Sequence, residues 1–206
     1  GCGASLGVPM ASEWKEQLRD KSRDELAYAL NSVGVKAEIA ERGVVEERLG
    51  LANDVSLIKK IAENSWHQRS LGTIDIAKGP IRWINILKKD SGQHNPPKWW
   101  VVLGIPDERP ISNHQTVNIK TVRNKTFPLF GKVVDVIWKG NDSGTDLVNV
   151  LSPDPAIKAL SQRIGNLEIK NHSNEFQGWT LTVDRRFSPT NQDWEALEKV
   201  TDHILS

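Results

Sequence analysis

The sequence has only one cysteine (Cys2) and one methionine (Met10) among its 206 residues. One cysteine excludes an internal disulfide and a zinc cluster built from cysteines. No apolar run approaches the roughly 20 residues that span a bilayer, and the longest, "WWVVL" at 99–103, has the length of a buried strand. The 27 basic and 26 acidic residues nearly cancel, so the chain has no overall field that would attract nucleic acid or anionic lipid.

The sequence also lacks the short motifs of the common enzyme classes. It has no G-x-S-x-G nucleophile elbow, no phosphate-binding glycine loop and no dinucleotide fingerprint. Its histidines show neither an i,i+4 pair nor a carboxylate at a zinc-site spacing, which favours surface or packing roles. They are His67, His94, His114, His172 and His203. We therefore predict no metal and no cofactor, and we assign no catalytic residue.

The opening stretch "GCGASLGVPM" has three interpretations. We favour Met10 as the natural start, with residues 1–9 a flexible leader or tag remnant. In the second, Cys2 is the lipidated residue of a lipoprotein, although the basic and apolar regions of a secretory signal are missing. In the third, the stretch is native tail. All three place residues 1–9 outside the fold. We expect a cytoplasmic protein, or one lipid-anchored through Cys2 if an upstream signal peptide was removed.

Helical periodicity dominates the first third of the chain. Apolar residues recur at helical spacing over 12–33, where Ser22 and Glu25 form a capping-box pattern that predicts a second helix start. Residues 35–50 fit a helix or, in their first half, an alternating strand, and we favour the helix. A clearer amphipathic helix is predicted over 55–66.

From residue 73 the hydrophobic period changes from 3.6 to 2, which indicates strands. The expected strands are 73–78, 81–88, 98–105, 115–123, 132–139, 166–171 and 178–185. The "WWVVL" run lacks alternation and predicts a central strand covered on both faces. The polar link 89–98 is too long for a tight turn, so we expect a projecting loop.

Two helices are expected near the C-terminus. One starts with Ser152 and Pro153 and ends at Ile164, and the other is capped by Thr190 with Asp193 in its first turn. Helices followed by antiparallel-type strands and further helices predict an α+β fold. We expect mainly antiparallel sheet with helices on one face, preceded by an N-terminal helical segment. Residues 10–206 are then a single soluble domain, helical over 10–66 and sheet with C-terminal helices over 73–206.

The most suggestive candidate for binding is the stretch "VRNKTFPLFGK" at 122–132, in which cations bracket aromatic residues. Such interleaving can contact phosphates and stack on rings, and binding groups concentrate on loops. The competing interpretation is a connecting loop whose phenylalanines close the end of the core. The candidate residues are Arg123, Lys125, Phe127, Phe130 and Lys132.

Tryptophan is frequent, with eight residues, and most fall on apolar faces and are expected in the core. Trp99 and Trp100 must face opposite ways on a regular strand, so one of them meets a second layer, a ligand or solvent. Trp99 joins the binding candidates on this ground. The "KGNDSGTD" stretch at 139–146 carries oxygen ligands suited to a hard cation, but we favour a tight turn.

The stretch "SRDELAYALNSVGVKAEIAERG" resembles the SAP motif, a small helix–extended–helix unit that binds nucleic acid. Leu26, Leu30, Gly34 and Val35, followed by Lys36, Glu38, Ile39 and Arg42, match its order of residue types. The resemblance covers about a tenth of the chain and implies nucleic-acid binding. The plain alternative is two packing helices joined by a glycine turn.

Three functions remain open from the sequence. We favour a non-catalytic binding or interaction module with a protein or small-molecule partner, homo-oligomerisation included, that uses the 122–132 loop and the neighbouring 89–98 loop. A hydrolase or transferase is the second, with Asp135 or Asp184 as acid or base beside Arg123 or Arg185. Nucleic-acid binding through the N-terminal helices and the basic-aromatic loop is the third, and it is not favoured.

Overall fold

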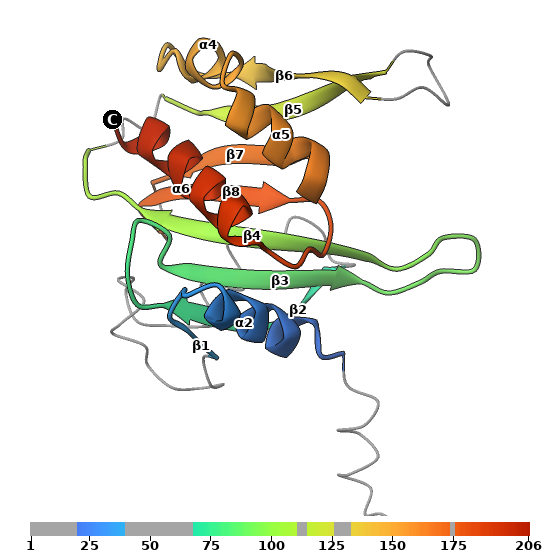
Figure 1. The fold of residues 1–206 in the computed structure, drawn as a ribbon. Helices are drawn as coiled ribbons and strands as arrows, with labels where there is room; N and C mark the ends of the chain where they lie inside the picture. The colour runs from blue at the N-terminus through green and yellow to red at the C-terminus, as the bar shows by residue number, and fades with distance from the viewer. Residues whose placement is uncertain (1–19, 40–67, 111–114, 126–132, 174–175) are drawn as a thin grey trace, which may run out of the picture.

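A computed structural model describes residues 20–39, 68–110, 115–125, 133–173 and 176–206. These residues form one open antiparallel sheet of eight strands, and the described helices lie on one of its faces (Figure 1). The predicted α+β fold, mainly antiparallel with helices on one face, is confirmed. Within the described ranges, no helix is long and apolar enough to cross a bilayer.

The strand order is β1-β2-β3-β4-β8-β7-β5-β6, and every neighbouring pair is antiparallel. All seven predicted strands are present within a few residues of their expected bounds. In sheet order the strands are β1 (Ala37–Ile39), β2 (Gln68–Ile76), β3 (Trp83–Lys89), β4 (Lys98–Pro106), β8 (Gly178–Val183), β7 (Leu167–His172), β5 (Asn118–Lys125) and β6 (Val133–Asn141). The predicted central position of "WWVVL" is confirmed, because β4 lies between β3 and β8.

Four helices are described: α2 (Ser22–Ser32), α4 (Leu147–Leu151), α5 (Pro155–Ile164) and α6 (Asn191–Leu205). The cap of α6 is as predicted, a reciprocal capping box between Thr190 and Asp193. The predicted start of α5 at Ser152 and Pro153 is wrong. Ser152 ends the short α4, and the carboxylate of Asp154 caps α5 by accepting a hydrogen bond from the Ala156 amide.

Helix α2 begins at Ser22, but its predicted capping box is wrong. The amide of Ser22, in the first turn of α2, instead donates a hydrogen bond to Asp20 Oδ1 at 2.9 Å. Acceptance by a carboxylate satisfies one of the unpaired amides of the first turn. The cap therefore lies two residues before the position that the Ser22–Glu25 spacing indicates.

The favoured helix over 35–50 is also wrong in its described part. Residues Ala37–Ile39 pair with β2 as strand β1, and the Asn31 side chain bonds both the amide and the carbonyl of Ala37. Gly34, at φ +85°, makes the turn that brings the chain back onto the sheet. The Lys-x-Glu stretch of the SAP resemblance is thus a strand rather than a second helix. The helix predicted over 55–66 lies outside the described residues.

The main core lies between the helices and the sheet and contains the leucines of α2, the apolar faces of α5 and α6, and alternate residues of the strands. Four of the six described tryptophans are buried, as expected for core residues: Trp83, Trp138, Trp179 and Trp194. Trp14 and Trp66 lie outside the described ranges.

Two loop predictions are confirmed. Residues 90–97 join β3 to β4 as a projecting hairpin loop, closed by a hydrogen bond from the Gly92 amide to the Asn95 carbonyl (Figure 1). The "KGNDSGTD" stretch forms the favoured turn, in which Asn141 and Asp142 each accept a hydrogen bond from the amide two residues on. Within the described residues, no group of three His, Cys, Asp or Glu could hold a metal ion.

Candidate functional site

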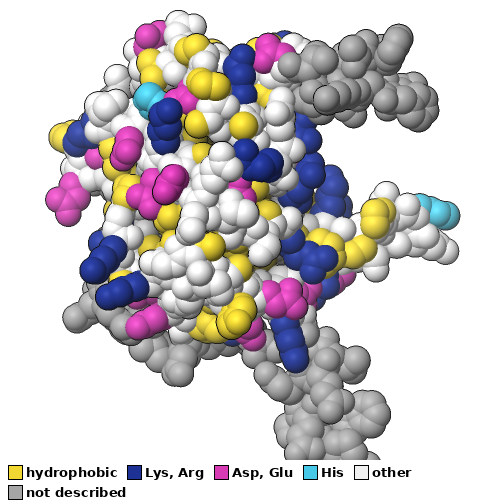
Figure 2. Space-filling view, in the orientation of Figure 1, with side chains coloured by type: hydrophobic (Ala, Val, Ile, Leu, Met, Phe, Trp, Pro, Cys, Tyr) yellow, Lys and Arg dark blue, Asp and Glu magenta, His cyan; other side chains and the backbone are white. Residues whose placement is uncertain are grey.

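A pocket of about 550 Å³ opens on the helix-bearing face, between α2 and the connection from β8 to α6. Strands β3 and β4 form its floor. Its lining residues are Ser22, Glu25, Leu26 and Ala29 from α2, Ile86, Trp99 and Val101 from the sheet, and Arg185, Arg186, Phe187 and Ser188 from the connection. Figure 2 shows lysine and arginine side chains gathered at this end of the sheet, beside the projecting hairpin.

The floor of the pocket is apolar because of strand alternation. Ile86 and Val101 are directly paired across β3 and β4, so both point to the helix-bearing face. Trp99 lies two residues before Val101 on β4 and therefore faces the same way. Leu26 closes the α2 side. An apolar floor with a few polar groups around it is the usual composition of a small-molecule pocket.

Trp99 is the residue at which the polar groups of the pocket meet. The guanidinium of Arg186 lies over its ring at 3.7 Å from the centroid, and the ammonium of Lys88 lies at 5.1 Å. Its indole N–H donates a hydrogen bond to Asp20 Oδ2 at 3.1 Å. Contacts of cations with an indole face are favourable. The ring is therefore held in one orientation by groups from three separate segments of the chain.

Asp20 orders this network. Its carboxylate accepts hydrogen bonds from Lys88 at 2.8 Å, from the indole of Trp99 and from the Ser22 amide, and its side chain is only 13% exposed. Burial alone would raise the pKa of Asp20, but the hydrogen bonds from Lys88, Ser22 and Trp99 outweigh burial and hold the pKa well below its ordinary value. Asp20 is thus ionised at neutral pH and neutralises Lys88.

Positive charge exceeds negative charge among the exposed residues that line the pocket. Arg185 and Arg186 are exposed on the connection, and Glu25 is exposed on α2. Arg185 has Asp184 at 3.7 Å, which is a loose surface pair. The described lining therefore carries two exposed cations and one exposed carboxylate around an apolar floor, and Arg186 reaches α2, where its Nη1 donates a hydrogen bond to Ser22 Oγ at 3.4 Å.

Among the described residues predicted to bind, Trp99 lines this pocket and Arg123 does not. Arg123, on β5, donates a hydrogen bond to the Ser161 carbonyl at 2.6 Å near the end of α5. Burial lowers the pKa of Arg123, and repulsion from Arg185 lowers it further.

The side chains of the other predicted binding residues are not among those that the structure describes. Lys125 ends β5, and its side chain is not among those described. Phe127, Phe130 and Lys132 lie outside the described residues. The 89–98 loop leaves the same end of the sheet as β5, and strands β8 and β7 lie between the two departure points. Residues 126–132 lie outside the described residues, so the predicted neighbourhood of the two loops stays a prediction.

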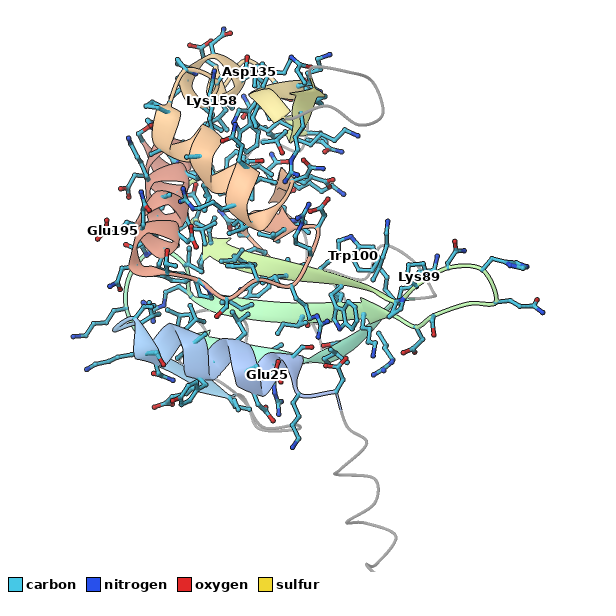
Figure 3. All side chains as sticks on the ribbon, turned by 45° about the vertical axis from the view of Figure 1, so that its right-hand side comes forward. Glu25, Lys89, Trp100, Asp135, Lys158 and Glu195 are labelled. Atoms are coloured by element: carbon cyan, nitrogen blue, oxygen red, sulfur yellow. The ribbon has the colours of Figure 1, made fainter. Side chains whose placement is uncertain are left out.

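Trp100 faces away from the pocket, as strand alternation requires. Its partner across the strands is Leu87, and the cations on the same side of the pair are Lys89 and Lys98. Figure 3 shows Trp100 and Lys89 at the base of the hairpin. Both tryptophans of "WWVVL" are only half-buried. The prediction that this strand is covered on both of its faces is therefore wrong at this end of β4.

The two carboxylates proposed for acid–base chemistry do not share a site. Asp135 bonds Lys158 at 2.9 Å at the β6 edge, where Figure 3 shows both side chains, and this hydrogen bond holds the pKa of Asp135 below its ordinary value. Asp184 follows β8 and accepts a hydrogen bond from the Asn166 amide. Strands β7 and β5 lie between them, a separation of roughly 14 Å at the usual strand spacing.

The pocket residues missed by the sequence interpretation are those of α2 and of the connection 185–188. The "DRRF" that follows β8 is a visible cluster of cations, but nothing in the sequence places β8 beside β4. That pairing joins residues about 80 positions apart. Only the tertiary topology brings Arg186 to Trp99.

A second pocket, of about 370 Å³, lies at the C-terminal end of α6. The buried carboxylate of Asp107 lines this pocket and accepts hydrogen bonds from two guanidinium nitrogens of Arg109. It also accepts one from the indole N–H of Trp179 at 3.0 Å. Arg109 also donates a hydrogen bond to the Ile204 carbonyl. These groups satisfy one another and fasten the end of α6 to the sheet, so their arrangement is structural.

Comparison with known proteins returned no matching family model, no matching curated protein and no matching solved structure.

Proposed function

We propose that this protein is a non-catalytic binding module whose ligand occupies the pocket around Trp99. The supporting observation is the combination of an apolar floor with the stacked pair of Trp99 and Arg186 at 3.7 Å. The volume of about 550 Å³ lies within the range of pockets that take small molecules.

The charges on the wall favour an anionic ligand with a flat or apolar body. Arg185 and Arg186 are exposed and their positive charge is only loosely neutralised, so an anion gains from contact with both. A ring or hydrocarbon that covers the apolar floor would bind favourably, because it removes apolar surface from contact with water. Lys88 contributes little charge, since Asp20 already pairs with it.

Catalysis receives no comparable support from these groups. The buried carboxylate beside Trp99, that of Asp20, already accepts hydrogen bonds from Lys88, from the indole of Trp99 and from the amide and hydroxyl of Ser22. A carboxylate held ionised by donors from three residues is a poor proton acceptor at neutral pH. Its contacts suit the positioning of Trp99.

The test is a fluorescence titration with 1-anilinonaphthalene-8-sulfonate, an aromatic anion of the proposed kind. The native protein should bind one equivalent with micromolar affinity. Ala29→Trp, which fills the pocket from α2, should abolish binding, and Arg186→Ala should weaken it about tenfold. Lys139→Ala, an exposed cation on β6, is the control and should bind as the parent does.

Circular dichroism of each variant checks that it is folded. Arg186→Ala changes an exposed side chain, so it tests the proposal even if Ala29→Trp fails to fold. Equal affinity for the parent, Arg186→Ala and Lys139→Ala would contradict the proposal.

A further inference from the structure

The pocket has hydrogen-bonding features that a simple aromatic anion would leave unused. Glu25 is exposed on the α2 side of the lining, and Ser188 adds an exposed hydroxyl group on the connection. Ser22 is buried, and its hydroxyl already bonds Asp20 and Arg186. A carboxylate repels an anion but accepts hydrogen bonds from N–H donors. A complementary ligand therefore carries N–H donors for Glu25, an anionic group for the exposed arginines and a flat body that covers the apolar floor.

The flat body has a ready stacking surface. Trp99 and Arg186 already form a stack of two planar groups, an indole and a guanidinium. Bases stack on aromatic rings and also on arginine planes. A base that lies on the guanidinium of Arg186 continues this stack above the apolar floor of Ile86 and Val101.

The anionic group has more than one cation to meet. Arg185 and Arg186 are consecutive, exposed, and both line the pocket. Arginine binds phosphate oxygens through paired N–H donors, which makes it the preferred partner of phosphate groups. This grouping needs no glycine-rich loop, and the sequence has none of that type.

We infer that the ligand is a nucleotide unit, with an amino-bearing base stacked at Trp99 and Arg186, its amino group donating to Glu25, and its phosphate held by Arg185 and Arg186. This inference rests on the proposed binding function of the pocket. The unit is either a free mononucleotide or one residue of a single-stranded nucleic acid, because both present the same base and phosphate. Carboxylates accept the exocyclic amino group of cytosine in this manner.

The experiment is isothermal titration of the full chain with CMP, UMP, cytidine and a twelve-residue oligocytidylate. CMP should bind, and cytidine, which lacks the phosphate, should bind at least tenfold more weakly. Glu25→Gln should weaken CMP several-fold and leave UMP nearly unchanged, since uracil has no exocyclic amino group. Arg185→Ala with Arg186→Ala should weaken both nucleotides. Glu195→Gln, an exposed carboxylate on α6, is the matched control and should change neither.

The oligonucleotide identifies the source of the unit. Binding of oligocytidylate much tighter than CMP, with a steep dependence on salt, supports a nucleic-acid strand. Similar affinities support the free nucleotide. No binding of CMP or oligocytidylate at millimolar concentration, in a protein that still binds the naphthalene sulfonate through Arg186, would overturn the inference and leave the binding function standing. Loss of sulfonate binding as well would overturn both.

Discussion

The guanidinium of Arg186 lies 3.7 Å from the centre of the Trp99 ring, and these residues are 87 positions apart in the chain. The contact joins β4 to the connection that follows β8. Asp20, from the segment before α2, bonds the same indole. Three distant segments thus converge on one side chain, and that convergence forms the pocket.

Replacement of Asp20 by asparagine should destabilise the protein by about 1–3 kcal/mol at pH 7, because Lys88 loses its buried partner. The pKa of Asp20 is below its ordinary value in the folded protein. Its stabilising effect is therefore complete above about pH 4 and is lost as the pH falls toward the folded-state pKa. Urea unfolding of the parent and of Asp20→Asn at pH 7 and pH 3 measures this.

Asp24→Asn is the control for that substitution. Asp24 forms a more exposed pair with Arg23, and such surface pairs contribute about 0–1 kcal/mol. If both variants lose the same stability, the special role assigned to Asp20 is refuted.

His172 should make the stability depend on pH between 4 and 6.5. Burial lowers its pKa from 6.5 to about 4, with a further contribution from the charge of Lys170. A histidine that is neutral in the fold contributes fully above pH 6.5, and the contribution is lost as the pH falls toward 4. The half-buried ring suggests a loss of about 2 kcal/mol, somewhat less than the full shift implies.

The measurement is the free energy of unfolding in urea at several pH values, for the parent and for His172→Gln. The glutamine variant lacks the titrating ring, so its curve should be flatter across this window. Parallel curves for the two proteins would show that the stability does not depend on His172.

Gly104→Ala should be severely destabilising, by about 3 kcal/mol or more. A Cβ at position 104 would lie 1.8 Å from the ring of Trp83, which is fully buried and directly opposite on β3. Gly92→Ala is the control, since a Cβ there meets no atom within 4 Å. Thermal or urea unfolding should place Gly92→Ala within about 0.5 kcal/mol of the parent. A mild effect at position 104 would mean that the Trp83 ring can move aside.

Thr190→Ala should reduce stability by about 1 kcal/mol, because it removes the side-chain half of the α6 capping box. Its partner Asp193 also pairs with Arg163 of α5 at 2.7 Å, so fraying of the first turn would loosen the packing of the two helices. Glu195→Ala, on the exposed face of α6, should cost much less. Equal losses from the two substitutions, measured by urea unfolding, would count against the cap.

The strands and the terminal helix could be predicted from the sequence because their signals are local. Alternation in "WTLTV" and the Thr190–Asp193 spacing reflect interactions between residues that are close in the chain. The cap of α2 was missed because the serine pattern competes with an aspartate two residues earlier. Strand β1 was missed because three residues of alternation carry less signal than the surrounding helical residue types.

The binding pocket could be predicted only in part. Trp99 was found because two adjacent tryptophans on one strand cannot share a face. Arg186 was not found, since its place depends on the pairing of β4 with β8, a contact between distant segments. Pairing across so many residues is set by the packing of the whole core, and no short pattern encodes it.

The most direct test of the binding site uses two indole signals in a ¹H–¹⁵N spectrum recorded while the naphthalene sulfonate is added. The indole N–H of Trp99 bonds Asp20 in the proposed binding pocket, and that of Trp179 bonds Asp107 in the second pocket. The two groups are chemically matched, so each reports on its own pocket. We predict that the Trp99 signal shifts in proportion to binding while the Trp179 signal stays in place. A shift of Trp179 with Trp99 unchanged would contradict the account.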